Sequence, residues 1–162
     1  GGGDDGAEGS GLISGVMVGR GFIDRPWSWA TLDSSLYGSA DPALNRRALL
    51  HAYAEYAERM EAEHPQRIRR VLLAPTLNLF AGEPHGKKFR STLDARAKDD
   101  RLSFPALLLG AATDTLLPET LDAAPGLVWH RNSAAYMTVE QAEEQTGRER
   151  AAKAQAGAGD MD

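Results

Sequence analysis

The chain of 162 residues contains no cysteine. Without thiols it can form neither a disulfide framework nor a thiolate metal site, and this composition suits an intracellular protein, in the cytoplasm or in an organelle. No apolar run approaches the roughly 18 residues of a membrane-spanning helix, and the first residues do not resemble a signal peptide. The sequence therefore predicts neither a disulfide-rich secreted domain nor a membrane partner.

Metal-ligand spacing is also absent. The histidines have no cysteine partners and are not spaced as ligands of one ion, so we expect no metal site. No residue of the chain is predicted to be catalytic. The histidines are His51, His64, His85 and His130.

The formal net charge of −5 conceals an uneven distribution. Residues 67–101 carry nine Lys and Arg against four Asp and Glu, whereas the segments on either side are both acidic. Local charge, more than total charge, steers the binding of phosphates. The basic segment is therefore a candidate contact for nucleic acid, and a solvated charged helix face is the alternative.

Secondary structure is predicted to be mainly helical after one strand. Residues 1–11 are rich in glycine and acidic residues, which predicts a flexible linker. Residues 12–18 are apolar and β-branched, as in a strand, and residues 19–40 are predicted to be a loop. Because Asp can cap a helix and Pro fits its first turn, Asp41-Pro42 predicts a helix over 41–64. Its apolar face would hold Leu44, Leu49, Ala52, Tyr53, Tyr56 and Met60.

Further helices are predicted over 67–81, interrupted at Pro75, and over 84–98, with another apolar segment at 104–112. From Glu140 onwards the composition predicts a frayed helix that passes into a disordered tail. The predicted domains are a linker (1–11), a strand and loop (12–40), a helical domain (41–125), and an extension with a tail (126–162).

Two motifs are more specific than these patterns. The first is Gly15-Val16-Met17-Val18-Gly19-Arg20, followed by Phe22 and by Arg25-Pro26-Trp27. The second is Leu77-Asn78-Leu79-Phe80-Ala81-Gly82-Glu83-Pro84, which continues into His85-Gly86-Lys87-Lys88-Phe89-Arg90. In this order and spacing, both motifs resemble the C-terminal part of the tRNA-dihydrouridine synthases, flavin enzymes that reduce uridine in tRNA.

The resemblance implies a fold and a set of site residues. The strand would be the last one of an FMN-binding (β/α)8 barrel, followed by a C-terminal helical bundle that binds tRNA. Gly19 and Arg20 would hold part of the FMN phosphate, with NADPH as the reductant of the flavin. The implied RNA contacts are Lys87, Lys88, Arg90, Arg67 and Arg70.

The chain is too short for a complete barrel of roughly 200 residues or more. We therefore expect it to be a piece of a longer enzyme and to be inactive alone, because the barrel cysteine that donates a proton in the family has no counterpart. The alternative is a non-catalytic RNA-binding or assembly module derived from such an enzyme. The sequence does not indicate which uridine would be modified or how many copies would assemble.

Overall fold

The computed structural model describes residues 17–64 and 68–158. Most of these residues are helical, in keeping with the predicted mainly α class. Residues 12–16 of the expected strand, and the 1–11 linker, lie outside the described residues. Met17 and Val18, at the end of that predicted strand, are not in a strand.

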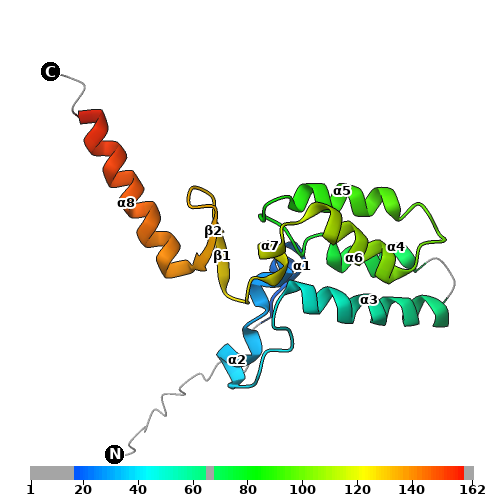
Figure 1. Cartoon of the computed structure of the whole chain (residues 1–162). Coiled ribbons are helices and arrows are strands. Elements are labelled where there is room, and N and C mark those ends of the chain that lie inside the picture. Colours follow the sequence, from blue (N-terminus) through cyan, green and yellow to red (C-terminus); the bar gives the residue numbers. More distant parts are fainter. Residues whose placement is uncertain (1–16, 65–67, 159–162) are drawn as a thin grey trace, which may run out of the picture.

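Three helices form the centre of the molecule. Helix α6 (Phe104–Thr115) packs against α3 (Arg46–Glu63) on one side and α5 (Gly86–Arg96) on the other (Figure 1). The core around α6 is aliphatic and aromatic, with Phe104, Leu107 and Leu108 almost fully buried. Phe80 and Phe89 meet edge to face with ring centroids 4.9 Å apart, so the segment before α5 joins the same core.

Helix α3 begins later than the sequence predicts. Asn45 is its N-cap, with the side-chain oxygen accepting from the backbone N–H of Ala48 at 2.8 Å. Asp41 instead accepts from the backbone N–H and the hydroxyl of Ser34, in helix α2 (Leu32–Tyr37). The prediction that Asp41 starts α3 is therefore wrong, because its carboxylate is bonded to another helix.

The buried face of α3 is also displaced from the predicted one. Arg46, Leu50, Ala54 and Ala57 are buried, whereas Leu44 is 81% exposed. Of the predicted face, Leu49, Tyr53 and Met60 are half-buried against the core, and Ala52 and Tyr56 are exposed.

Between α3 and α5 the chain makes only short helices. Helix α4 (Arg69–Leu73) leads into the 3-10 helix η2 (Ala74–Thr76), followed by turns up to the start of α5. Pro75 therefore ends the helix predicted over 67–81, as the missing N–H and fixed ring of proline require. The helix predicted over 84–98 is confirmed in its central part as α5.

The N-terminal described segment is a series of short helices. Helix α1 (Arg20–Asp24) and the 3-10 helix η1 (Pro26–Trp29) precede α2. Phe22 and Trp29 stack with centroids 5.1 Å apart, and Trp27 is buried. The loop predicted over residues 19–40 is thus partly helical.

The C-terminal part adds elements that the sequence did not predict. After helix α7 (Pro118–Asp122), strands β1 (Leu127–His130) and β2 (Ala135–Thr138) form an antiparallel hairpin in which Trp129 pairs with Tyr136. Helix α8 (Val139–Ala158) then runs away from the helical body (Figure 1). The helix predicted from Glu140 is thus confirmed as α8, and residues 159–162 of the predicted tail lie outside the described residues.

Helix α8 contacts the hairpin through polar side chains. The imidazole of His130 lies 3.3 Å from the hydroxyl of Thr146, and Asn132 donates to Glu149. In the described part of the chain, no helix is both long and apolar enough to cross a membrane.

Candidate nucleic-acid interface

The first half of α5 carries the basic residues of the second motif. Lys87, Lys88 and Arg90 are all exposed, and none makes a hydrogen bond or ion pair through its side chain with any described residue. The positions 87, 90, 91 and 94 share one helix face because three- and four-residue steps return to the same side. The helix therefore presents unneutralised positive charge to solvent.

A hollow beside α5 brings two of the predicted residues together. Lys87 and Arg90 line it with Ser91, Asp94 and Leu77, around a volume of about 430 Å³. Lys88 does not line this hollow and lies beside it on the helix surface.

A second hollow of about 670 Å³ adjoins the first between α4 and α5. Leu77 and Asp94 line both, and we call the two adjoining hollows together the α5 groove. Arg70 and Lys98 line its second part, and both side chains are exposed. The groove thus brings together Arg70, Lys87 and Arg90, three of the residues for which RNA contacts are predicted.

The other basic residues nearby are held by structural contacts. Arg69 donates to both carboxylate oxygens of Glu61 at 2.7 Å and to the carbonyls of Asp99 and Leu102. Its hydrogen bond to Glu61 raises the pKa of the Arg69 guanidinium above its ordinary value. Arg96 pairs with Asp114. Arg67 lies outside the described residues, so its predicted RNA contact stays a prediction.

A buried charge network fixes the turn that precedes α5. Arg46 of α3 is 2% exposed and pairs with Glu83 of that turn, whose second oxygen accepts from the hydroxyl of Tyr136. The Arg46 guanidinium also lies 4.8 Å from the ring centroid of Trp27 and donates to the carbonyl of Thr120. Burial lowers the pKa of Arg46 and raises that of Tyr136.

The backbone at the start of α5 has special requirements. His85, its N-cap, has a φ of 61°, in the left-handed region that favours glycine. Its ring lies 3.0 Å from the carbonyl of Thr115 on α6. A Cβ on Gly86 would lie 2.0 Å from the carbonyl oxygen of Phe80, so only glycine allows this close packing.

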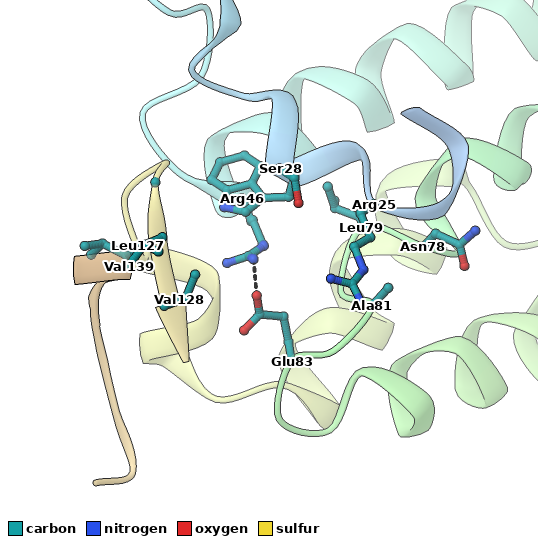
Figure 2. A pocket seen from close by; sticks show the side chains of 12 residues that line it. Arg25, Ser28, Arg46, Asn78, Leu79, Ala81, Glu83, Leu127, Val128 and Val139 are labelled. Carbon is teal, nitrogen blue, oxygen red and sulfur yellow. Dashed lines mark hydrogen bonds and ion pairs between the residues drawn. The ribbon is translucent and has the colours of Figure 1, made fainter. Parts of the chain in front are cut away.

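A smaller hollow of about 220 Å³ lies next to the network (Figure 2). In Figure 2 the Arg46–Glu83 pair lies between Arg25 and Asn78 on one side and Val128 of the hairpin on the other. Sequence reasoning missed this hollow and the Arg46–Glu83 pair, because the lining residues come from five separate segments. The groove residues Asp94, on α5, and Lys98, in the turn after it, were also missed, although the four-residue step from Arg90 to Asp94 is a usable signal.

The predicted phosphate residues lie elsewhere on the surface. Gly19 precedes α1 with nothing within 4 Å of the position of a Cβ, and Arg20 is exposed in the first position of that helix. Neither lines the α5 groove or the hollow beside Arg46. Among residues 17–64 and 68–158, no group of three or more potential ligands could hold a metal ion.

Comparison with known proteins gives two similar relatives. A tRNA-dihydrouridine(20/20a) synthase of Synechocystis sp. is 28% identical over 118 residues, which are 72% of this chain and 32% of that protein. A tRNA-dihydrouridine(20/20a) synthase of Pseudomonas aeruginosa is 35% identical over 81 residues, which are 50% of this chain and 24% of that protein. The matched part thus spans a third or less of each relative.

No family model and no solved structure matches the chain. The two relatives nevertheless confirm the resemblance that the two motifs predicted.

Proposed function

We propose that this chain, which is related in sequence to the tRNA-dihydrouridine synthases, is the C-terminal portion of an FMN-dependent synthase that contacts tRNA through the α5 groove. The observation that carries the proposal is the set of exposed, unneutralised cations on and beside α5. Lys87, Arg90 and Arg70 line the α5 groove, and Lys88 lies next to it.

Phosphate contacts are the chemistry that suits these side chains. Half or more of the hydrogen bonds that DNA-binding proteins make go to phosphate and sugar, and they position the protein without reading sequence. The lysines and arginines that are tied to carboxylates, such as Arg69 and Arg96, have their charge compensated within the fold. Lys87 and Arg90 are free to bind an external anion.

The Arg46–Glu83 pair would support this contact indirectly. It joins α3 to the turn from which α5 begins, and Tyr136 adds the hairpin to the same network. A rigid start of α5 keeps the cations of its first turns in a fixed arrangement, which reduces the entropy lost when they bind.

Gly19 and Arg20 are suited to form one part of a binding site for the flavin phosphate. Both are exposed, and the space around Gly19 is open, so a phosphate could approach the backbone and the guanidinium. FMN, when bound in a complete enzyme, would supply the hydride that reduces the uracil ring, with NADPH as the ultimate donor. Residues outside this chain would have to supply the proton and the remaining flavin contacts.

The names of the two relatives favour a synthase over a non-catalytic module. A fluorescence titration of labelled tRNA at low salt tests the RNA contact directly. We expect the double variant Lys87→Ala/Arg90→Ala to bind roughly tenfold or more weakly than the parent, because two phosphate contacts are lost.

The matched control is the double variant Arg150→Ala/Lys153→Ala on α8, which removes the same charge from exposed helical positions. It should bind tRNA as the parent does. Equal affinities of the parent and the Lys87→Ala/Arg90→Ala variant would remove α5 from the RNA interface.

A further inference from the structure

The α5 groove has an apolar floor between its charged residues. Its exposed apolar surface comes from the half-buried Leu77 and Ala97, which lie over Leu73 and Leu93, 5% and 0% exposed. A depression that bound phosphates alone would gain nothing from exposing aliphatic surface to water. The floor therefore indicates a ligand with both an anionic backbone and flat, weakly polar parts.

The cations lie at the two ends of this groove. Lys87 and Arg90 line one end, whereas Arg70 and Lys98 line the other. The nine steps from Lys87 to Arg96 cover about 14 Å along α5 at 1.5 Å per residue, and Lys98 lies in the turn just beyond its end. That length suits a short stretch of one nucleic-acid strand, since single-strand sites use a positively charged groove that follows the backbone.

Two acidic residues line the groove: Asp100 lies at the end that holds Arg70 and Lys98, and Asp94 lies between the two ends. Asp94 lines both parts of the groove, and its carboxylate makes no ion pair or hydrogen bond with any described residue. A carboxylate can only accept hydrogen bonds, and it repels phosphates. Its position suits a ligand that offers a donor between two phosphates, as the ribose 2′-hydroxyl of RNA does.

We infer that the α5 groove binds an unpaired stretch of RNA, with bases on the apolar floor, phosphates at the two cationic ends, and a 2′-hydroxyl donating to Asp94. This inference rests on the proposed function and names the part of a tRNA that the groove receives. A duplex does not fit equally well, because its bases are stacked inside and cannot reach the floor.

The test compares three labelled probes of about 12 nucleotides without stable self-structure: single-stranded RNA, single-stranded DNA of the same sequence, and the RNA in a blunt duplex. The parent should bind single-stranded RNA about tenfold more tightly than either of the others. Equal or tighter binding of the duplex would overturn the inference.

Asp94→Ala tests the inference through the direction in which the affinity changes for RNA and for DNA. Loss of a hydrogen bond to a charged group should weaken binding of single-stranded RNA by about tenfold. Binding of single-stranded DNA should stay unchanged or strengthen, because only a repulsive charge is lost. Asp94→Asn, which keeps an acceptor, should restore RNA binding to within a few-fold of the parent.

The exposed residue Glu119 on α7 provides the control, since Glu119→Ala removes one negative charge away from the groove. This variant should change the affinities for single-stranded RNA and single-stranded DNA by the same factor. If Asp94→Ala strengthens the binding of both probes as Glu119→Ala does, Asp94 is only a repulsive charge and the inference is wrong.

The outcome separates this inference from the proposed function. If all three probes bind equally and Lys87→Ala/Arg90→Ala weakens each of them, the proposed RNA contact stands and the unpaired-strand inference fails. If no probe depends on Lys87 and Arg90, both fail.

Discussion

Arg46 of α3 and Glu83 of the turn before α5 form an ion pair with side chains that are 2% and 11% exposed. Two further segments meet at this pair, because Trp27 stacks on the guanidinium and Tyr136 donates to the carboxylate. The pair thus connects the N-terminal segment, α3, the start of α5 and the hairpin. We expect it to govern the stability of the whole helical body.

Removal of one partner should be strongly destabilising. Glu83→Ala leaves the Arg46 charge buried without its counter-ion, which typically costs about 3–5 kcal/mol. Urea unfolding followed by circular dichroism measures this free energy. Arg47→Ala is the matched control, since its pair with Asp122 is 41% and 49% exposed and should be worth no more than about 1 kcal/mol. Equal losses in the two variants would contradict a structural role for the buried pair.

The alkaline stability of the protein should depend on Tyr136. Burial, with the hydrogen bond to Glu83, raises the pKa of Tyr136 above its ordinary value of about 10. Because the folded state holds this proton to higher pH than the unfolded state, the associated stability is complete below about pH 10 and is lost as pH rises toward the folded pKa.

Tyr136→Phe should therefore flatten the fall in unfolding free energy between about pH 9 and 11, measured by urea denaturation at each pH. Tyr37→Phe serves as the control, because that ring is 75% exposed. An unchanged slope in Tyr136→Phe would show that Tyr136 does not hold its proton in the folded state.

Two glycines allow a comparison of the same substitution in opposite settings. A Cβ on Gly86 meets the carbonyl of Phe80, so Gly86→Ala should destabilise by roughly 1–3 kcal/mol or more through forced backbone movement. Gly147 in α8 has nothing within 4 Å, and Gly147→Ala should stabilise or have little effect, given the higher helix propensity of alanine. Thermal unfolding of both variants checks this, and a tolerated Gly86→Ala would contradict the packing at the start of α5.

The chain expressed alone should not retain FMN. Gly19 and Arg20 offer only a few hydrogen bonds, each worth about 1.5–3 kcal/mol at best when charged, and they line none of the hollows described above. The absorbance of the purified protein at the flavin bands measures how much FMN it retains. A stoichiometric yellow complex would contradict the assignment of the remaining flavin contacts to residues outside the chain.

The sequence predicted those features that depend on local chemistry. Pro75 interrupts its helix because it lacks an N–H, and Lys87 and Arg90 share a face because of the helical repeat. The start of α3 was not predictable in this way. Asp41 and Asn45 are both good caps, but the Asp41 carboxylate is bonded to Ser34 of α2, and Asn45 caps α3.

The hairpin was not predicted because tertiary contacts, and not its local sequence, specify it. Its strands are four residues each, and the turn between them contains neither glycine nor proline. Ala134 occupies a left-handed conformation with φ 48° where glycine or asparagine is usual. Packing of Trp129 on Tyr136, and of Tyr136 against Glu83, holds a turn whose local sequence does not specify it.

The central claim is that the cations of α5 bind RNA phosphates, and the salt dependence of tRNA affinity tests it most directly. The logarithm of the binding constant should fall linearly with the logarithm of salt concentration, with a slope set by the number of phosphates contacted. Lys87→Ala and Arg90→Ala should each flatten this slope by about one unit and the double variant by about two, whereas Arg150→Ala/Lys153→Ala should leave it unchanged. Parallel lines for the parent and the Lys87→Ala/Arg90→Ala variant would contradict the account.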